Sequence, residues 1–577
     1  MTTASTPSGS AVVAAAGPRF SLRAGPPRPL GRIGGAAGAW SDRAASLSGA
    51  LGPGAQLLRP APGAGGPRLV VDGDGASLDG APLSELPPAS VASLSGRLAD
   101  VRGAFAIAWW DDAGALRLAR DAIGERSLFY AESGGGLAFA SALRPLSDAG
   151  LAGRTLDPAA VVRYLAYAYV PGSRTLLREV RELAPGEVLR FRDGRAERSR
   201  WWELPAEPRD DGGVDEAALA RELRETLETA VRARLPAPGE PCAALLSGGL
   251  DSSLVVALAR RLHEGPLSAY SISFGDAHAN ELPFSEAVAR HCGIPHRVVE
   301  LRPDVVSHHL EDTMGALSDP IGDPLTVPNA VLFRELARES RVALNGEGGD
   351  PCFGGPKNLP MLLARLFGDG GREEPPERSY LRSHHKCYDD LGAMLEPDLV
   401  ASLEEHPLEA ELAPYLGDPR WPRFVTQLMA INVALKGPHH ILQKVDCQSF
   451  PFGVLPRSPL FDRAIVELAF RIPARLKLRG SEEKYLLKRA VADLLPPEIV
   501  TRPKSGMLVP IEAWFRGPLR RHARGLLLDG LAPRGLVRRR YLEDLLAGRL
   551  GGVRPRYGAK VWLLVALEAW LRSVVDG

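Results

Sequence analysis

The chain has 577 residues, of which 45% are hydrophobic and 24% charged, so it is long enough for about two to four folded domains. Seventy basic and 69 acidic residues leave a net charge of +1, which excludes a bulk attraction to nucleic acid or to an anionic membrane, although the basic stretch 534–545 leaves a local contact open. Five scattered cysteines without CxxC spacing, and the lack of an apolar run of about 18 residues, predict a soluble cytoplasmic protein with neither nucleic-acid nor membrane partners.

The first part of the chain predicts a poorly ordered arm followed by a β-rich domain. Residues 1–65 are dominated by Ala, Gly, Pro and Ser, with room for a first strand within 19–33. Between 66 and 205, short apolar runs such as LRLAR, SLFYAE and LAFASAL alternate with turn residues, which favours hairpins in a layered domain. The stretch PAEPRDDGGVDE, residues 205–216, has no apolar periodicity and predicts a domain boundary.

The pattern changes to strands alternating with helices after this boundary. A helix is expected over 216–235, strands over 243–246, 267–274, 296–301 and 341–345, and further helices over 252–262, 284–292 and 327–337. Because this alternation produces a parallel sheet with crossover connections, we expect an α/β domain over 215–530. The remainder looks mainly helical, including an extension over 531–577.

The first strand of this domain ends in SGGLDSS, residues 247–253. Ligands of open α/β sheets bind beyond the carboxyl ends of strands, where glycines allow close approach and the next helix offers unpaired N–H groups to an anion. The stretch therefore predicts a phosphate cradle made by Ser247, Gly248, Gly249, Ser252 and Ser253. Asp251 would repel a polyphosphate unless a cation such as Mg²⁺ lies between them. The alternative is a plain strand-to-helix turn with Asp251 as a cap.

A second glycine-rich stretch, LNGEGGDPCFGG, follows the strand expected at 341–345. It carries Glu347 and Asp350 three residues apart, so that one acid can hold a metal while the other acts as a base. A simple surface connection is the alternative. Between the two glycine-rich stretches, Asp319 and Asp323 in SDPIGDPLTVP either face the metal or the substrate amine, or cap a turn.

In this order, SGGLDSS, SISF, DPIGDP, NGEGGD, RSPLFD, EEKYLLKRA and TRPKSGM resemble the synthetase domain of the glutamine-dependent asparagine synthetase superfamily. The resemblance implies an adenine-nucleotide α-hydrolase-like fold of the PP-loop, Rossmann-like type. It also implies an enzyme that activates a carboxylate with ATP as an acyl-adenylate, releases pyrophosphate, and lets an amine attack to form an amide.

The same resemblance assigns roles to individual residues. Residues 247–253 would hold pyrophosphate, Asp251 and Asp350 would bind Mg²⁺, and Glu347 would orient or deprotonate the nucleophile. The adenosine would be framed by Leu245, Ile272 and Gly346. Lys504 would neutralise charge developing on the α-phosphate and acyl oxygen, and Lys484 is a further candidate for contact with the nucleotide; simple solvation is the alternative for both lysines.

The N-terminal half resembles the glutaminase domain of that superfamily, a type 2 glutamine amidotransferase with an Ntn-hydrolase-like αββα fold. The resemblance rests on GAFAIAWWDDAGALRLARDAIGERSLFYA, residues 103–131, and LAPGEVLRF, residues 183–191. A working glutaminase needs an N-terminal cysteine, whereas this sequence begins MTTASTPSGS, and the expected NGE of the glutamine pocket is replaced by DGDGAS at 72–77. A nucleophilic Thr2 would need a rigid placement that the arm does not offer. We therefore expect a degenerate domain over 66–205.

Without internal ammonia, the nucleophile would be an amine borne by the substrate, as the resemblance to β-lactam synthetases and lasso-peptide macrolactam cyclases suggests. Pro351 follows Asp350, and Leu455 precedes Arg457, at positions where the family usually has acids, so the acceptor pocket should differ. Cys352 is either a thioester-forming group or a small core residue, and His439-His440 either pack or contact the substrate.

Three functions follow from these patterns. The first is an amide-forming ligase whose small-molecule or peptide substrate carries both a carboxylate and an amine, with a leader-binding or carrier protein as a partner. The second is an ammonia-dependent asparagine synthetase that uses free aspartate. The third is a silent nucleotide-binding scaffold, against which stands the presence of all four of Asp251, Glu347, Asp350 and Lys504.

Overall fold

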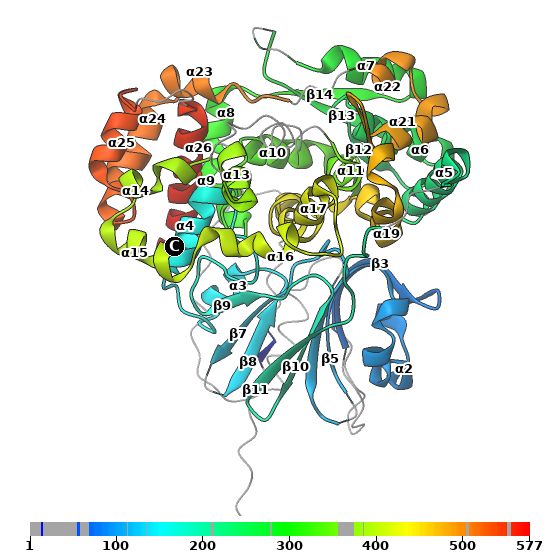
Figure 1. Ribbon diagram of the computed structural model, residues 1–577, viewed down its shortest axis with the longest axis horizontal. Coiled ribbons are helices and arrows are strands. Elements are labelled where there is room, and N and C mark those ends of the chain that lie inside the picture. The colour runs from blue at the N-terminus through cyan, green and yellow to red at the C-terminus, as the bar shows by residue number, and fades with distance from the viewer. Residues whose placement is uncertain are drawn as a thin grey trace, which may run out of the picture. The chain divides into compact units, whose positions relative to one another are not determined.

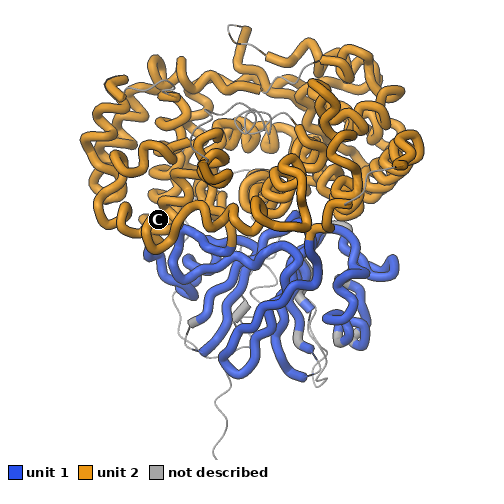
Figure 2. Tube along the Cα trace, in the orientation of Figure 1, with its two compact units in different colours: residues 1–155, 173–203 blue, residues 156–172, 204–577 orange. Residues whose placement is uncertain are grey.

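A computed structural model describes residues 13–14, 55–57, 69–111, 113–133, 135–208, 213–276, 278, 280–355, 374–384, 386–502, 507–550 and 556–577. Contacts divide the chain into unit 1, residues 1–155 and 173–203, and unit 2, residues 156–172 and 204–577 (Figure 2). The segment 156–172 belongs to unit 2 by contacts, although the predicted domain 66–205 contains it. The strand expected within 19–33 lies outside the described residues.

Unit 1 is built on two β-sheets (Figure 1). The larger has the strand order β11-β10-β6-β5-β3-β2, with β4 paired to β3, and the smaller has the order β1-β8-β7-β9. The strands are β1 (Val13–Ala14), β2 (Ala55–Leu57), β3 (Leu69–Leu78), β4 (Ala81–Pro82), β5 (Arg102–Trp110), β6 (Leu116–Arg120), β7 (Phe129–Ser133), β8 (Gly136–Ala140), β9 (Val180–Glu182), β10 (Glu187–Arg192) and β11 (Arg195–Arg200). The strands expected in LRLAR, SLFYAE and LAFASAL are β6, β7 and β8. Of these, only β7 and β8 form a hairpin with each other, because β6 pairs with β5 and β10 in the larger sheet.

Strand β5 is buried on both of its faces. Phe105 and Ile107 belong to one apolar cluster, which includes Val91 of the short helix α2 (Pro88–Ala92). Ala106 and Ala108 belong to a second cluster, filled by side chains of the smaller sheet. Because successive side chains of a strand point to opposite faces, β5 joins the sheet-on-sheet core to the layer outside it.

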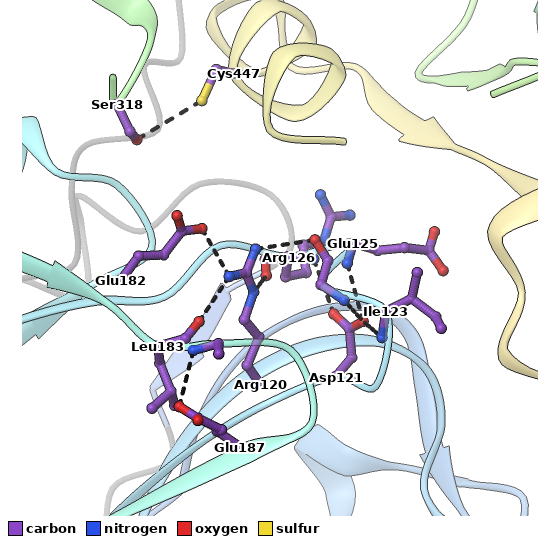
Figure 3. Close-up of polar contacts among 12 residues, drawn as sticks. Arg120, Asp121, Ile123, Glu125, Arg126, Glu182, Leu183, Glu187, Ser318 and Cys447 are labelled. Atoms are coloured by element: carbon purple, nitrogen blue, oxygen red, sulfur yellow. Dashed lines mark hydrogen bonds and ion pairs between the residues drawn. The ribbon is translucent and has the colours of Figure 1, made fainter. Parts of the chain in front are cut away.

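The turn after β6 is held by its own acid (Figure 3). The Asp121 carboxylate accepts hydrogen bonds from the backbone N–H groups of Ile123, Gly124 and Glu125 at one oxygen, over 2.6–3.1 Å, and from Arg126 at the other. The neighbouring Arg120 is fully buried; it donates to the carbonyl of Leu183 at 2.8 Å and pairs with Glu182 at 2.8 Å. The RDAIG stretch, residues 120–124, therefore has a structural role in this chain.

Unit 2 contains a parallel sheet with the strand order β14-β13-β12-β15-β16. Its strands are β12 (Cys242–Leu245), β13 (Leu267–Ser273), β14 (His296–Glu300), β15 (Val342–Leu344) and β16 (Leu455–Arg457), and the helices expected from the sequence are α5 (Glu216–Arg232), α6 (Leu250–Leu262), α7 (Leu282–Cys292) and α10 (Thr326–Leu336). Strand β16 was not predicted, since three residues that include Pro456 carry no strand pattern. Its position at the sheet edge is where a proline is tolerated.

The rest of unit 2 is mainly helical. Its remaining longer or functionally placed helices are α4 (Pro158–Tyr167), α8 (Pro303–His308), α9 (Leu310–Ala316), α11 (Gly349–Phe353), α13 (Pro376–Ser383), α14 (Leu391–Met394), α15 (Pro397–Glu405), α16 (Ala413–Leu416), α17 (Phe424–Ala430), the π-helix η7 (Ile431–Leu442), α18 (Gln443–Ser449), α19 (Arg463–Arg471), α20 (Ala474–Lys477), α21 (Tyr485–Val491), α22 (Pro497–Thr501), α23 (Ile511–Arg516), α24 (Arg520–Arg524), α25 (Arg539–Leu546) and α26 (Tyr557–Trp570). Helix α26 is buried almost all round, which explains its apolar composition. Within the described residues, no helix has the length and apolarity needed to cross a bilayer.

Candidate active site

The residues expected to frame adenosine lie at the carboxyl ends of three neighbouring strands. Leu245 is the last residue of β12, Ile272 is next to last in β13, and Gly346 follows β15 by two positions. Strand β12 is hydrogen-bonded to both β13 and β15. The three residues therefore border the same edge of the sheet, where ligands of open α/β sheets bind.

The loop from β12 into α6 is tight and glycine-dependent. Gly248 has φ +77°, and a Cβ there would lie 2.6 Å from the backbone nitrogen of Ser285. The hydroxyls of Ser247 and Ser252 are 3.1 Å apart, and Gly249 N–H donates to Ser247 Oγ at 3.3 Å. Gly249 then caps α6, so the unpaired N–H groups of the first helical turn face the loop region.

Ser253 is the most deeply buried serine of the expected cradle. Its side chain is fully buried, whereas Ser247 and Leu250 are partly exposed. No hydrogen-bond partner for Ser253 Oγ lies within the described part of the chain. Its role as a phosphate ligand stays a prediction.

The two acids expected to bind metal converge on one ammonium group. Lys484 Nζ lies 2.6 and 2.7 Å from the two carboxylate oxygens of Asp251 and 2.6 Å from Asp350 Oδ1. All three side chains are largely buried, with Lys484 only 3% exposed. Burial alone would lower the pKa of Lys484, but the two carboxylates outweigh it and raise that pKa above its usual value.

Close packing of two glycines brings these acids together. A Cβ on Gly349 would overlap the Asp251 carboxylate, and a Cβ on Gly346 would lie 2.5 Å from the backbone nitrogen of Ser252. The loop after β15 therefore lies directly against the first turn of α6. This contact explains the glycine content of LNGEGGD better than a simple surface connection does.

A pocket beside this cluster is lined by Lys484 and by two further basic side chains, Lys488 and Arg502, that sequence reasoning did not single out. Its lining residues are Gly249, Leu250, Glu483, Lys484, Lys488, Ile499 and Arg502. Arg502 is held in place: it pairs with Glu281, donates to the carbonyl of Gly248 at 3.2 Å, and stacks over the Phe284 ring at 3.8 Å. Lys488 could have been found, because it follows Lys484 by one helical turn.

Glu347 lies in the loop that follows β15. Its backbone N–H donates to the side-chain oxygen of Asn345 at 3.0 Å, a contact that the sequence did not reveal. Its carboxylate is one of the charges that raise the pKa of Lys444, together with Asp323, which pairs with Lys444 at 2.6 Å. Burial of Lys444 opposes this rise.

Two other expected site residues have contrasting outcomes. Lys504 lies outside the described residues. Cys352 is fully buried in α11, its thiol donates to the carbonyl of Leu460 at 3.6 Å, and burial raises its pKa well above the usual range. This environment fits a core residue and not a nucleophile.

The geometry agrees with comparisons to known proteins. The Asparagine synthase family model matches residues 222–572, more than half of the chain. The chain belongs to the asparagine synthase family. The Glutamine amidotransferase domain model matches residues 95–202. Together these matches confirm the Ntn-hydrolase-like and PP-loop, Rossmann-like folds expected from the sequence.

Individual relatives agree with the family match. Asparagine synthetase [glutamine-hydrolyzing] 1 of Bacillus subtilis is 24% identical, over 82% of this chain and 77% of the relative. Carboxyethyl-arginine beta-lactam-synthase of Streptomyces clavuligerus is 26% identical, over 51% of this chain and 45% of the relative. Among solved structures, an NH3-dependent NAD synthetase from Campylobacter jejuni aligns with a TM-score of 0.19 and 13% identity, over 35% of this chain and 96% of that one.

Membership of the asparagine synthase family fixes the class of chemistry. The protein is an ATP-dependent carbon–nitrogen ligase that forms AMP and pyrophosphate, as the resemblance predicted. Asp251, Asp350 and Lys484 converge beside the loops that follow β12 and β15, at the edge of the sheet where open α/β folds bind ligands.

Proposed function

We propose that the protein adenylates a carboxylate of its substrate and joins it to an amine carried by a substrate, forming an amide. The observation that carries the proposal is the convergence of Asp251 and Asp350 on Lys484 beside the basic pocket at the start of α6. This arrangement puts anionic ligands for a cation next to cationic ligands for a phosphate.

The donor set fits Mg²⁺. Asp251 and Asp350 already share one cationic partner at 2.6 Å, which means that the pair tolerates a positive charge between them. Mg²⁺ is commonly bound by one or two carboxylates together with substrate phosphates. When bound there, Mg²⁺ would neutralise charge on the polyphosphate.

The protein's own groups supply the remaining steps. The N–H groups of the first turn of α6, with Lys488 and Arg502, would hold the departing pyrophosphate. Glu347 would orient the attacking amine and accept its proton. Lys504 would stabilise the charge on the acyl oxygen.

Departures from the family pattern favour a substrate-borne amine over ammonia from glutamine. The DGDGAS stretch, residues 72–77, lies within β3, whose pairing with β5 shifts register between Asp74 and Ser77. Leu455 begins β16 and pairs with Val342, which puts an apolar side chain where the family usually has an acid. Synthesis of asparagine from aspartate and ammonia is the second candidate; the name of the B. subtilis relative supports asparagine as the product, with glutamine as the nitrogen source.

The test measures AMP and pyrophosphate from the purified full chain with ATP, Mg²⁺ and hydroxylamine as a trapping amine. Carboxylates to be compared are aspartate, glutamate and N-acetyl-aspartic acid α-amide. We expect carboxylate-dependent AMP, and Asp350→Asn should abolish it because the metal site loses a charge. Asp304→Asn is the matched control, since that exposed acid pairs only locally with Arg302.

Each alternative has a distinct result. Asparagine made from aspartate with ammonia, at a rate above that of every other carboxylate, would establish the second candidate. Turnover supported by glutamine would contradict the interpretation of the N-terminal domain. ATP binding without AMP from any carboxylate would leave the silent scaffold as the better description, and normal AMP formation by Asp350→Asn would contradict the metal assignment.

A further inference from the structure

A polar cluster near Glu347 has no part in the nucleotide chemistry described above. We call it the Tyr169 cluster; it consists of Tyr169, Asp323, His440 and Lys444. Lys444 Nζ lies 2.6 Å from Asp323 Oδ2, and the rings of Tyr169 and His440 have centroids 5.3 Å apart at an angle of 57°. His440 and Lys444 are four residues apart along η7 and α18, so they lie on one helical face.

The cluster is fixed from three segments of unit 2. Gly322, next to Asp323, donates its backbone N–H to the carbonyl of Ala168, next to Tyr169, at 2.8 Å. Asp323 Oδ1 in turn accepts the N–H of Leu325 at 3.0 Å. The helical segment that carries His440 is a π-helix, a form often found at functional sites.

Three side-chain atoms of this region are buried without a hydrogen-bond partner in the described part of the chain. They are the Tyr169 hydroxyl oxygen, His440 Nδ1 and the amide oxygen of Gln443, which follows His440 by three residues. Tyr169 as a whole is only 3% exposed. Folded proteins rarely leave such atoms unpaired, so each one needs an explanation, such as a bound water, ion or ligand.

The charged members of the cluster are already satisfied. Burial would raise the pKa of Asp323, but the charge of Lys444 outweighs it and lowers that pKa far below its usual value. Burial, then the charge of Lys444, lowers the pKa of His440 well below its usual value, so the imidazole is neutral near pH 7; Lys436 and Lys386 add to this, and Asp323 opposes it. What remains unpaired is therefore a hydroxyl, a neutral imidazole and an amide oxygen.

Access and position connect this cluster to the reaction. The Asp323 side chain is 22% exposed and His440 is partly exposed, so the cluster is not sealed. The Glu347 carboxylate is close enough to Lys444 to raise the pKa of that lysine. A substrate whose amine approaches Glu347 would therefore bring its neighbouring atoms to the Tyr169 cluster.

We infer that Tyr169 and His440 bind an uncharged amide group of the substrate, adjacent to its reacting amine or carboxylate. An amide offers one acceptor to the Tyr169 hydroxyl and one donor to the imidazole nitrogen, which matches two of the three unpaired groups. A free amino acid would instead bring a charged carboxylate, and the nearest ammonium of the cluster, Lys444, is already neutralised by Asp323. The inference rests on the proposed function and deepens it: the substrate class is peptide-like.

The test uses equilibrium binding to the full chain saturated with Mg²⁺ and an ATP analogue that cannot be cleaved between the α- and β-phosphates. The probes are N-acetyl-aspartic acid α-amide and free aspartate, and their binding is measured by calorimetry. We expect the amide probe to bind more tightly than aspartate, and Tyr169→Phe or His440→Leu to weaken its binding about three- to tenfold, the loss of one hydrogen bond. Binding of the nucleotide analogue should not change.

Tyr167→Phe is the matched control, because the Tyr167 hydroxyl is also buried but donates to the carbonyl of Leu408 at 2.7 Å. It should lower thermal stability and leave binding of the amide probe unchanged. Tyr169→Phe should instead leave thermal stability unchanged and weaken binding of the amide probe, since the Tyr169 hydroxyl has no partner to lose within the described residues.

The outcomes separate this inference from the proposed function. Unchanged affinity of the amide probe in Tyr169→Phe and His440→Leu, no measurable binding of that probe, or tighter binding of aspartate would each overturn the inference. If no carboxylate supports AMP release while the amide probe still binds through Tyr169, the proposed chemistry would be overturned. The inference of an amide-binding site would then stand.

Discussion

Lys484 is the residue whose role changes most when the structure is considered. From the sequence, a lysine in EEKYLLKRA is as easily a solvated helix residue as a nucleotide ligand. In the fold it caps α21 with φ 54° and ψ 33°, a left-handed conformation that is uncommon outside glycine. This backbone conformation accompanies the placement of its ammonium group between Asp251 and Asp350. We expect Lys484 to stabilise the two acids until a metal ion replaces it.

Replacement of Lys484 by methionine tests this exchange. Two buried carboxylates would then face each other without a cation. Removal of one partner of a buried ion pair typically lowers the free energy of unfolding by about 3–5 kcal/mol. We expect a lower melting temperature that millimolar Mg²⁺ restores in part, whereas the wild type should respond little to Mg²⁺. Calorimetry with and without Mg²⁺ provides the measurement.

Lys488→Met is the control for this experiment, since Lys488 lines the same pocket and has a weak pairing with Glu482 at 3.8 Å. It should lose less stability and gain nothing from Mg²⁺. An unchanged melting temperature for Lys484→Met would contradict the bridging role.

At the scale of elements, the alternation of strands and helices was readable because each element is long enough to show its period. Helix α6 and strand β13 fall within two residues of the ranges expected at 252–262 and 267–274. Strand β16 was missed because it is short, and π-helix η7 because nothing in its pattern distinguishes it from an α-helix. The role of Arg502 was also missed, because it depends on a contact with Gly248 in a distant segment. The role of Asn345 was missed although its contact with Glu347 spans only two residues.

The packing of the loop after β15 against α6 yields a prediction for Gly346→Ala. The new Cβ would lie 2.5 Å from the backbone nitrogen of Ser252 and 2.7 Å from its Cα, so one of the two elements must move. Overpacking of this kind costs about 1–3 kcal/mol. Because both elements border the proposed nucleotide site, we expect the affinity for an ATP analogue to fall about tenfold or more.

Gly392→Ala is the corresponding control in α14, where an added Cβ meets no atom within 4 Å. It should raise stability slightly, by about 0.5–1 kcal/mol, and leave nucleotide affinity unchanged. Wild-type affinity in Gly346→Ala would show that the loop can move away from α6 without consequence, and would weaken the packing argument.

At the scale of the molecule, the family and both folds were predictable because their motifs are local and occur in a fixed order. The assignment of residues 156–172 to unit 2 was not predictable, since it depends on contacts such as that of the Tyr164 hydroxyl with the carbonyl of Leu563. The substrate was not predictable either. Its recognition depends on side chains such as Tyr169 and His440, which lie 271 residues apart in the sequence.

The reactivity of the cysteine thiols of unit 2 shows whether its core unfolds cooperatively. Cys242, Cys352 and Cys387 are buried, and burial raises the pKa of Cys242 and of Cys387 to about 12, whereas Cys292 and Cys447 are partly exposed. Iodoacetamide should therefore label the native protein at Cys292 and Cys447 first, as followed by mass spectrometry of peptides. If the core is cooperative, the three buried thiols should become reactive together as denaturant rises. Early labelling of Cys352 alone would mean that α11, which carries Asp350, opens locally. It would also support the alternative that Cys352 is a reactive thiol of the active site.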